Sequence, residues 1–108
     1  MKREIAIGIA VYNPKVSILT RLEEMLNNHF SLFIYDNSPE SAISKKIREK
    51  FVQDENKICY LTSGKNTGLG VALSALCAQA FYDSFSALLF FDQDTIFNPK
   101  TLEYIEEF

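Results

Sequence analysis

The sequence predicts an α/β fold, a three-layer sandwich in which helices cover both faces of a mostly parallel sheet. Short apolar runs of strand length alternate along the chain with longer segments whose apolar residues recur at helical spacing. Each apolar run ends in polar residues typical of turns, which separate it from the next helical segment. Strands that alternate with helices in this way pair in parallel through right-handed crossovers.

The first strand and helix are predicted near the N-terminus. Ile5 to Val11 is an apolar run of strand length. Asn13 followed by Pro14 predicts that a helix begins there, because asparagine caps helix N-termini and proline suits the first helical position. The expected helix has one apolar face, made by Val16, Leu19, Leu22, Met25 and Leu26.

The remaining elements follow the same alternation. The expected order is a strand from Ser31 to Tyr35, a helix that opens at Pro39 or Ser41 and carries Ile43, Ile47 and Phe51, a shorter strand from Lys57 to Leu61, a polar loop from Thr62 to Thr67, a helix from Gly68 to Tyr82, a strand from Ser86 to Phe91, and a final helix from Lys100 to Glu107. The complete βαβαβαβα pattern is Rossmann-like, and residues 1–108 are expected to form a single domain.

Charge and composition argue against some classes of function. The formal net charge of -3 argues against a nucleic-acid-binding surface. An anionic ligand would therefore need a helix N-terminus or a bound cation. Cys59 and Cys77 are expected to be buried free thiols, which indicates a reducing compartment. His29 lies near a predicted helix end, where a solvated or capping role is expected rather than catalysis.

The strand expected from Ser86 to Phe91 carries the strongest functional signal. Its continuous apolar run predicts a strand buried on both faces. Asp92 and Asp94 follow at once, in a loop where both carboxylates can converge on one ligand. Carboxylates brought together repel each other, and a bound divalent cation offsets that repulsion. An acidic surface turn is the alternative interpretation.

The other strand exits lie at the same edge of a parallel sheet, where open α/β folds bind ligands. Asp36 follows the second strand and is expected outside the core. There it would accept a hydrogen bond from a nucleobase or a ribose hydroxyl, or else form an Asx-turn or helix cap. The segment from Asn66 to Gly70 precedes a helix, and its glycines allow close backbone approach to an anion. Lys65 beside it is either a phosphate contact or a solvated residue.

Four motifs occur in order along the chain: Val11-Tyr12-Asn13-Pro14, Tyr35-Asp36-Asn37-Ser38, Asn66-Thr67-Gly68-Leu69-Gly70 and Phe91-Asp92-Gln93-Asp94. Together they resemble the family 2 glycosyltransferases, which have the GT-A fold. The Asp-Gln-Asp-Thr form is most similar to the rhamnosyltransferase-like branch. The resemblance covers nearly the whole chain and implies the N-terminal, nucleotide-binding half of a GT-A domain.

The resemblance also implies roles for single residues. Ala10, Val11, Tyr12, Asn66 and Gly68 would line the nucleotide pocket, Asp36 would contact the base, Asp92 would approach the ribose and assist the metal, and Asp94 would ligate Mg or Mn. The donor would be a nucleotide-diphosphate sugar such as dTDP-rhamnose or a UDP-sugar. The acceptor would be a glycan or a lipid-linked molecule of polysaccharide biosynthesis, which implies a cytoplasmic location at the inner face of the membrane.

The sequence departs from the family pattern in two places. Ser74 stands where much of the family has an asparagine or arginine after the glycines. In the family, the catalytic base and the acceptor-binding half follow the Asp-x-Asp motif, whereas this chain ends at Phe108. No catalytic residue is therefore assigned, and residues 1–108 alone are expected not to transfer sugar. The final helix, with Leu102, Ile105 and Phe108 apolar, is expected to expose a patch that favours self-association.

Two other functions remain open. The apolar run followed by Asp92-Gln93-Asp94-Thr95 also resembles the haloacid-dehalogenase phosphatase signature, in which Asp92 would be the nucleophile and Asp94 an acid/base. The second alternative is a non-catalytic fragment that binds nucleotide and transfers nothing.

Overall fold

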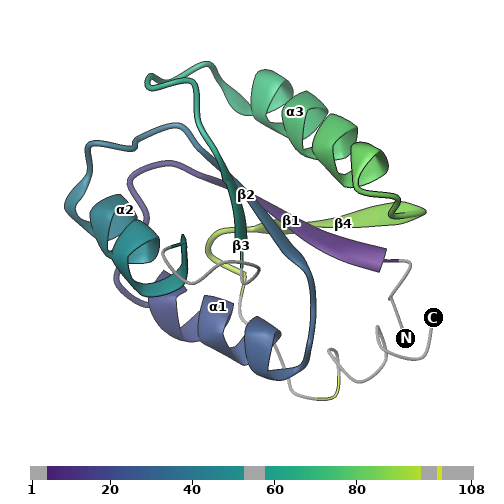
Figure 1. Cartoon of the computed structure of the whole chain (residues 1–108). Helices are drawn as coiled ribbons and strands as arrows, with labels where there is room; N and C mark the ends of the chain where they lie inside the picture. Colours follow the sequence, from purple (N-terminus) through teal and green to yellow (C-terminus); the bar gives the residue numbers. More distant parts are fainter. Residues whose placement is uncertain (1–4, 53–57, 96–99, 101–108) are drawn as a thin grey trace.

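The computed structural model describes residues 5–52, 58–95 and 100, and its elements confirm the predicted α/β order (Figure 1). The elements are β1 (Ile5–Val11), α1 (Ile18–Asn27), β2 (Leu32–Asp36), α2 (Ala42–Ile47), the π-helical segment η1 (Arg48–Val52), β3 (Ile58–Leu61), α3 (Leu69–Tyr82) and β4 (Ala87–Asp92). The helix predicted from Lys100 to Glu107 lies outside the described residues except for Lys100, and so does the apolar patch expected on it.

The strands of the described sheet pair in parallel in the order β3-β2-β1-β4. The chain therefore builds the sheet outward from β1 to β3, and then crosses back to place β4 on the other side of β1. This reversal makes the gap between the carboxyl ends of β1 and β4 the topological switch point, where open α/β sheets bind ligands. At this edge Val11 of β1 lies beside Asp36 of β2, and Ala10 lies beside Asp92 of β4.

Two apolar clusters, one on each face of the sheet, hold the helix layers of the predicted sandwich against the sheet. β1 presents Ile7 and Ile9 to the side covered by α1 and α2. Ala6 of the same strand faces α3, which contributes Ala72 and Ala80 (Figure 1). Small residues on both partners let α3 pack closely on the sheet. None of the helices in the described part of the chain is long and apolar enough to cross a membrane.

The first helix begins later than the Asn13-Pro14 pair predicted. α1 begins at Ile18, and Val16, which was expected on its apolar face, is 60% exposed. Asn13 instead adopts a left-handed conformation with φ 42°, and its N–H donates to Ser38 Oγ at 2.7 Å. This hydrogen bond joins the exits of β1 and β2 and holds Asn13 outside the helix. A tertiary contact has overridden a local capping signal.

The second helix opens at Ser41, one of its two predicted starts. Ser41 Oγ accepts a hydrogen bond from the Ser44 N–H at 3.2 Å, which caps the helix N-terminus. Pro39, the other predicted start, lies in the turn before it. The chain continues past Ile47 as η1, which brings Phe51 into the core beneath the sheet.

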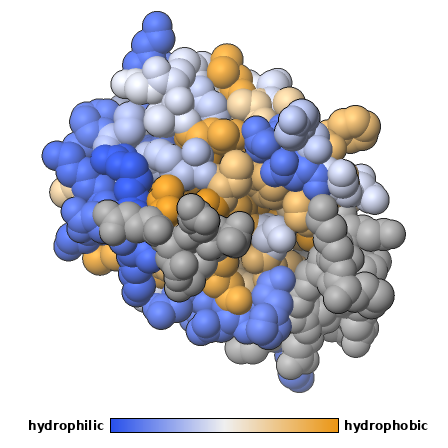
Figure 2. All heavy atoms as spheres, in the orientation of Figure 1, coloured by the Kyte–Doolittle hydropathy of each residue, from blue (hydrophilic) through white to orange (hydrophobic). Residues whose placement is uncertain are grey.

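β4 is an edge strand of the described sheet, so the prediction that it is buried on both faces was wrong. Leu89 and Phe90, on opposite faces of β4, are 37% and 39% exposed, because the described helices cover this edge strand less fully than the inner strand β2, whose residues are all buried. The burial expected for Cys77 was also wrong, since it lies exposed on α3, while Cys59 is half-buried and both are free thiols as predicted. In the orientation of Figure 1, the space-filling view in Figure 2 shows apolar residues through the middle of the visible face, beside hydrophilic residues on the left.

Candidate functional site

A cleft of about 570 Å³ opens at the carboxyl edge of the sheet, at the switch point between β1 and β4. Its walls come from the end of β1, the exit of β2, the start of α3 and the turn after β4. The lining residues are Ala10, Val11, Tyr12, Asn37, Asn66, Gly68, Leu69, Leu73, Phe90, Phe91, Asp92, Gln93 and Asp94. The cleft is therefore assembled from segments that are distant in the sequence.

The cleft contains seven of the eight residues predicted to bind nucleotide or metal. These are Ala10, Val11, Tyr12, Asn66, Gly68, Asp92 and Asp94. They meet because every strand of a parallel sheet ends at the same edge, and because β1 and β4 are neighbours. The eighth residue, Asp36, is not part of the lining.

Asp92 and Asp94 lie on a tight turn that follows β4. The Asp92 carbonyl accepts the Thr95 N–H at 2.9 Å, and Asp92 Oδ1 accepts the Asp94 N–H at 2.9 Å. Both aspartates are exposed. Within the described residues, no hydrogen bond reaches Asp92 Oδ2 or the carboxylate of Asp94. These oxygens are therefore available to a ligand.

The acidic turn offers the right kind of ligand atom for a hard divalent cation, but too few of them. Carboxylate oxygens are the ligands that Mg and similar ions prefer, and these ions take about six. In residues 5–52, 58–95 and 100 there is no group of three or more His, Cys, Asp or Glu side chains that could hold a metal. A cation at Asp92 and Asp94 would need further oxygens from a bound molecule or from water.

Gln93 joins the ends of β1 and β4, a role that its sequence context does not predict. Its Oε1 accepts the Tyr12 N–H at 2.8 Å, and its Nε2 donates to the Tyr12 carbonyl at 3.0 Å. Arg21 of α1 donates to the Gln93 carbonyl at 2.6 Å. A glutamine in a polar turn carries no local signal of a partner 81 positions away, so only the fold reveals this contact.

Asn37 makes a second connection between segments of the cleft. It is only 6% exposed, and its Oδ1 accepts the Thr67 N–H at 3.0 Å. Its Nδ2 donates to the Gly68 carbonyl at 3.3 Å. The side-chain amide thus ties the start of α3 to the end of β2. It belongs to a predicted exit motif, but the sequence assigned it no role of its own.

The N-terminus of α3 borders the cleft. Gly68 precedes the helix with φ 85° and ψ 170°, a conformation that essentially only glycine adopts without strain. Its N–H donates to Asn66 Oδ1 at 2.9 Å, and Leu69, the first helical residue, is 63% exposed. Free N–H groups and the helix dipole give this end a partial positive charge, which favours an anion in the cleft.

Asp36 is the last residue of β2 and is fully buried, so the expectation that it lies outside the core was wrong. Its Oδ1 accepts the Ser38 N–H at 2.8 Å and the Ser38 hydroxyl at 3.2 Å, which is the Asx-turn that the sequence offered as an alternative. The Tyr60 hydroxyl donates to Oδ2 at 2.5 Å and accepts from Arg48 at 2.9 Å. Burial and the hydrogen bond to Asp36 raise the pKa of Tyr60 to about 12.

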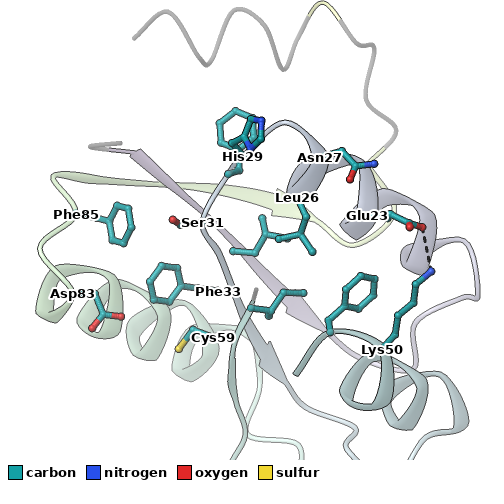
Figure 3. A pocket seen from close by; sticks show the side chains of 14 residues that line it. Glu23, Leu26, Asn27, His29, Ser31, Phe33, Lys50, Cys59, Asp83 and Phe85 are labelled. Atoms are coloured by element: carbon teal, nitrogen blue, oxygen red, sulfur yellow. Dashed lines mark hydrogen bonds and ion pairs between the residues drawn. The ribbon is translucent and has the colours of Figure 1, made fainter. Parts of the chain in front are cut away.

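A larger cavity, of about 770 Å³, lies at the opposite, amino edge of the sheet (Figure 3). An ion pair between Glu23 and Lys50, 3.1 Å apart, borders one side, and the edge-to-face rings of Phe33 and Phe85 border another. His29 also lines it, in the turn after α1, in agreement with its predicted position near a helix end. None of the residues predicted for nucleotide or metal lines this cavity. The cleft at the carboxyl edge is therefore the candidate site.

The fold and the cleft define the class of the chain: a parallel α/β domain with a ligand cleft at the carboxyl edge of its sheet. Its sequence matches the family model "Glycosyl transferase family 2" over residues 6–108. The chain therefore belongs to glycosyltransferase family 2, and its parallel sheet is consistent with a Rossmann-like half of a GT-A domain. A search of curated proteins gave no match. The family match favours glycosyl transfer over the phosphatase interpretation of Asp92 and Asp94.

Proposed function

We propose that the cleft binds the nucleoside diphosphate of a sugar-nucleotide donor, and that this chain supplies donor and metal binding for sugar transfer. One observation carries the proposal: the sheet gathers seven residues predicted for these roles into one cleft at the switch point. Membership of glycosyltransferase family 2 supports the sugar-transfer chemistry.

The end of β1 suits the nucleoside. Ala10 and Val11 give a small apolar wall, and Tyr12 beside them is 52% exposed. A half-exposed aromatic ring at the rim of a cleft can stack on any nucleobase, because every base has a flat π-face. Asp92 lies opposite Ala10 in the sheet, so its free Oδ2 would accept a hydrogen bond from a ribose hydroxyl.

The diphosphate would lie between the N-terminus of α3 and the acidic turn. The helix N-terminus at Gly68 and Leu69 attracts it, whereas Asp92 and Asp94 repel it unless a cation lies between them. The two carboxylates fit Mg or Mn by donor type, with Asp94 as the main ligand, and diphosphate oxygens would supply the coordination that they lack. Such a cation would stabilise the negative charge on the departing nucleoside diphosphate.

We propose that Asp36 contacts a nucleobase only by exchanging one of its present hydrogen-bond partners for the base. Its carboxylate is buried, and Oδ2 is already bonded to the Tyr60 hydroxyl. Contact with a base therefore requires that a base N–H take the place of the Tyr60 hydroxyl. This exchange would keep the buried carboxylate hydrogen-bonded throughout.

The donor and acceptor follow from the resemblance. The Asp-Gln-Asp-Thr sequence supports the rhamnosyltransferase-like branch, and we propose dTDP-rhamnose or a UDP-sugar as donor. The acceptor would be a glycan or a lipid-linked molecule of polysaccharide biosynthesis, at the cytoplasmic side of the membrane. A non-catalytic nucleotide-binding protein would use the same cleft, and a donor-hydrolysis assay with dTDP-rhamnose and UDP-glucose discriminates between the two.

Thermal unfolding with UDP or dTDP, in Mn²⁺ or in EDTA, tests the proposal. A ligand that binds only the folded state raises the Tm, so we expect a larger rise with nucleotide and Mn²⁺ than with nucleotide in EDTA. Asp94→Asn is expected to remove the Mn²⁺-dependent part of the rise. The matched control is Glu40→Gln, which neutralises an exposed carboxylate away from the cleft. Equal rises in Mn²⁺ and EDTA, or no rise at all, would contradict the proposal.

A further inference from the structure

We propose that Gln93 is a positioning residue that couples nucleotide binding at Tyr12 to metal binding at Asp92 and Asp94. Its side chain holds the backbone of Tyr12, and its own backbone lies between the two aspartates. This inference rests on the proposed function of the cleft. It adds the residue that links the nucleotide-binding part of the cleft to its metal-binding part.

The side-chain amide of Gln93 extends the pairing of β1 with β4 beyond its last backbone register. That register places Ala10 beside Asp92. Gln93 then supplies both an acceptor and a donor to the peptide groups of Tyr12, at 2.8 and 3.0 Å. A primary amide can do this because it carries one carbonyl and one NH₂ group, the same pair that a neighbouring peptide would present.

Arg21 fixes the backbone of Gln93 from a second direction. Its guanidinium donates to the Gln93 carbonyl at 2.6 Å, and a charged donor makes this hydrogen bond stronger than a neutral one. Arg21 lies on α1, while Tyr12 directly follows β1, so two separate segments hold one residue. A solvated surface glutamine would have neither contact.

The contacts of Gln93 determine where both carboxylates lie. Gln93 is the second residue of the turn from Asp92 to Thr95, which is closed by the hydrogen bonds of Asp92 to the N–H groups of Asp94 and Thr95. Because hydrogen bonds hold Gln93 at this position, the backbone of Asp92 and of Asp94 on either side of it is held as well. The free oxygens of Asp92 and Asp94 therefore keep a constant position relative to Tyr12, and one nucleoside diphosphate can meet all three groups.

Calorimetric titration of the chain with UDP and with dTDP, each in Mn²⁺ and in EDTA, tests the coupling. The coupling factor is the Kd in EDTA divided by the Kd in Mn²⁺, and both values come from the same preparation, so the folded fraction cancels. Gln93→Met keeps the length of the side chain and removes both hydrogen bonds to Tyr12. We expect it to reduce the coupling factor at least fivefold. Gln79→Met, which alters a hydrogen-bonded glutamine on α3 outside the cleft, is expected to leave it unchanged.

The coupling factor is a readout that a merely structural role of Gln93 would not change. Loss of folded protein weakens the apparent affinity for nucleotide equally in Mn²⁺ and in EDTA, whereas loss of the two hydrogen bonds to Tyr12 changes the ratio of the two Kd values.

The outcomes separate the two proposals. If the wild type binds neither UDP nor dTDP, the proposed function of the cleft is wrong, and the coupling falls with it. If the wild type binds nucleotide with a clear Mn²⁺ effect and Gln93→Met retains the same coupling factor, only the role of Gln93 is wrong.

Discussion

Replacing Asp36 with alanine should destabilise the fold, although the residue lies at a strand end beside the candidate site. The substitution removes the acceptor of three hydrogen bonds, from the Ser38 N–H, the Ser38 hydroxyl and the Tyr60 hydroxyl. Both Asp36 and Ser38 are completely buried, so water does not replace the lost acceptor.

The magnitude follows from these contacts. Each buried donor that loses its partner costs about 1–3 kcal/mol. The Ser38 hydroxyl makes the longest of the three hydrogen bonds, at 3.2 Å, and can rotate, and the half-buried Tyr60 hydroxyl can turn to water. The N–H of the completely buried Ser38 is therefore the one full loss, and the expected loss in the free energy of unfolding is about 1–3 kcal/mol. That is a large part of the 5–15 kcal/mol, roughly, that stabilises a typical domain.

Urea unfolding followed by circular dichroism measures this loss. Asp36→Asn keeps an oxygen for the Ser38 N–H but turns a donor toward Tyr60, and is expected to fall between the wild type and Asp36→Ala. The control is Glu40→Ala, which removes an exposed carboxylate nearby and should change the free energy of unfolding by less than about 0.5 kcal/mol. If Asp36→Ala is as stable as Glu40→Ala and loses only nucleotide affinity, the carboxylate serves the ligand and not the fold.

Two further predictions concern neighbours of the cleft. The raised pKa of Tyr60 means that its contribution to stability is complete below pH 10, the ordinary tyrosine value, and is lost as the pH rises to about 12. The stability difference between the wild type and Tyr60→Phe should therefore shrink over that range in urea unfolding at fixed pH values, and a constant difference would count against the Asp36 contact. Gly68→Ala should destabilise by about 1–3 kcal/mol through backbone strain alone, since no atom lies within 4 Å of the added methyl group. Gly70→Ala, inside α3 and equally unobstructed, should stabilise by about 0.5–1 kcal/mol, and equal effects of the two glycine substitutions would refute the strain at Gly68.

Much of the fold was predictable because its signals are local. The alternation of apolar runs with helical spacing gave all four described strands and the three described α-helices in the right order. The cleft was predictable for the same reason, since a parallel sheet brings every strand exit to one edge whatever the strand order. Ala10, Gly68 and Asp94 therefore meet as expected.

The errors came from contacts between distant segments. Asn13 does not start the predicted helix, because its N–H donates to Ser38, 25 positions away. The buried Asp36 accepts a hydrogen bond from Tyr60, which a different strand supplies. The exposure of β4 depends on the strand order, which the sequence pattern does not determine. The role of Gln93 has no local signal, because its partner Tyr12 lies 81 positions away.

The most direct test of the candidate site is to map the amides that respond to nucleotide. The ¹⁵N-labelled chain would be titrated with UDP and with dTDP in the presence of Mg²⁺, and the amide resonances followed by NMR. The largest shifts are expected at Tyr12, Gly68 and Asp94, around the cleft at the carboxyl edge. Shifts centred on Cys59 and Phe85, around the cavity at the amino edge, would show that the nucleotide binds elsewhere, and the absence of any shift would show that it does not bind.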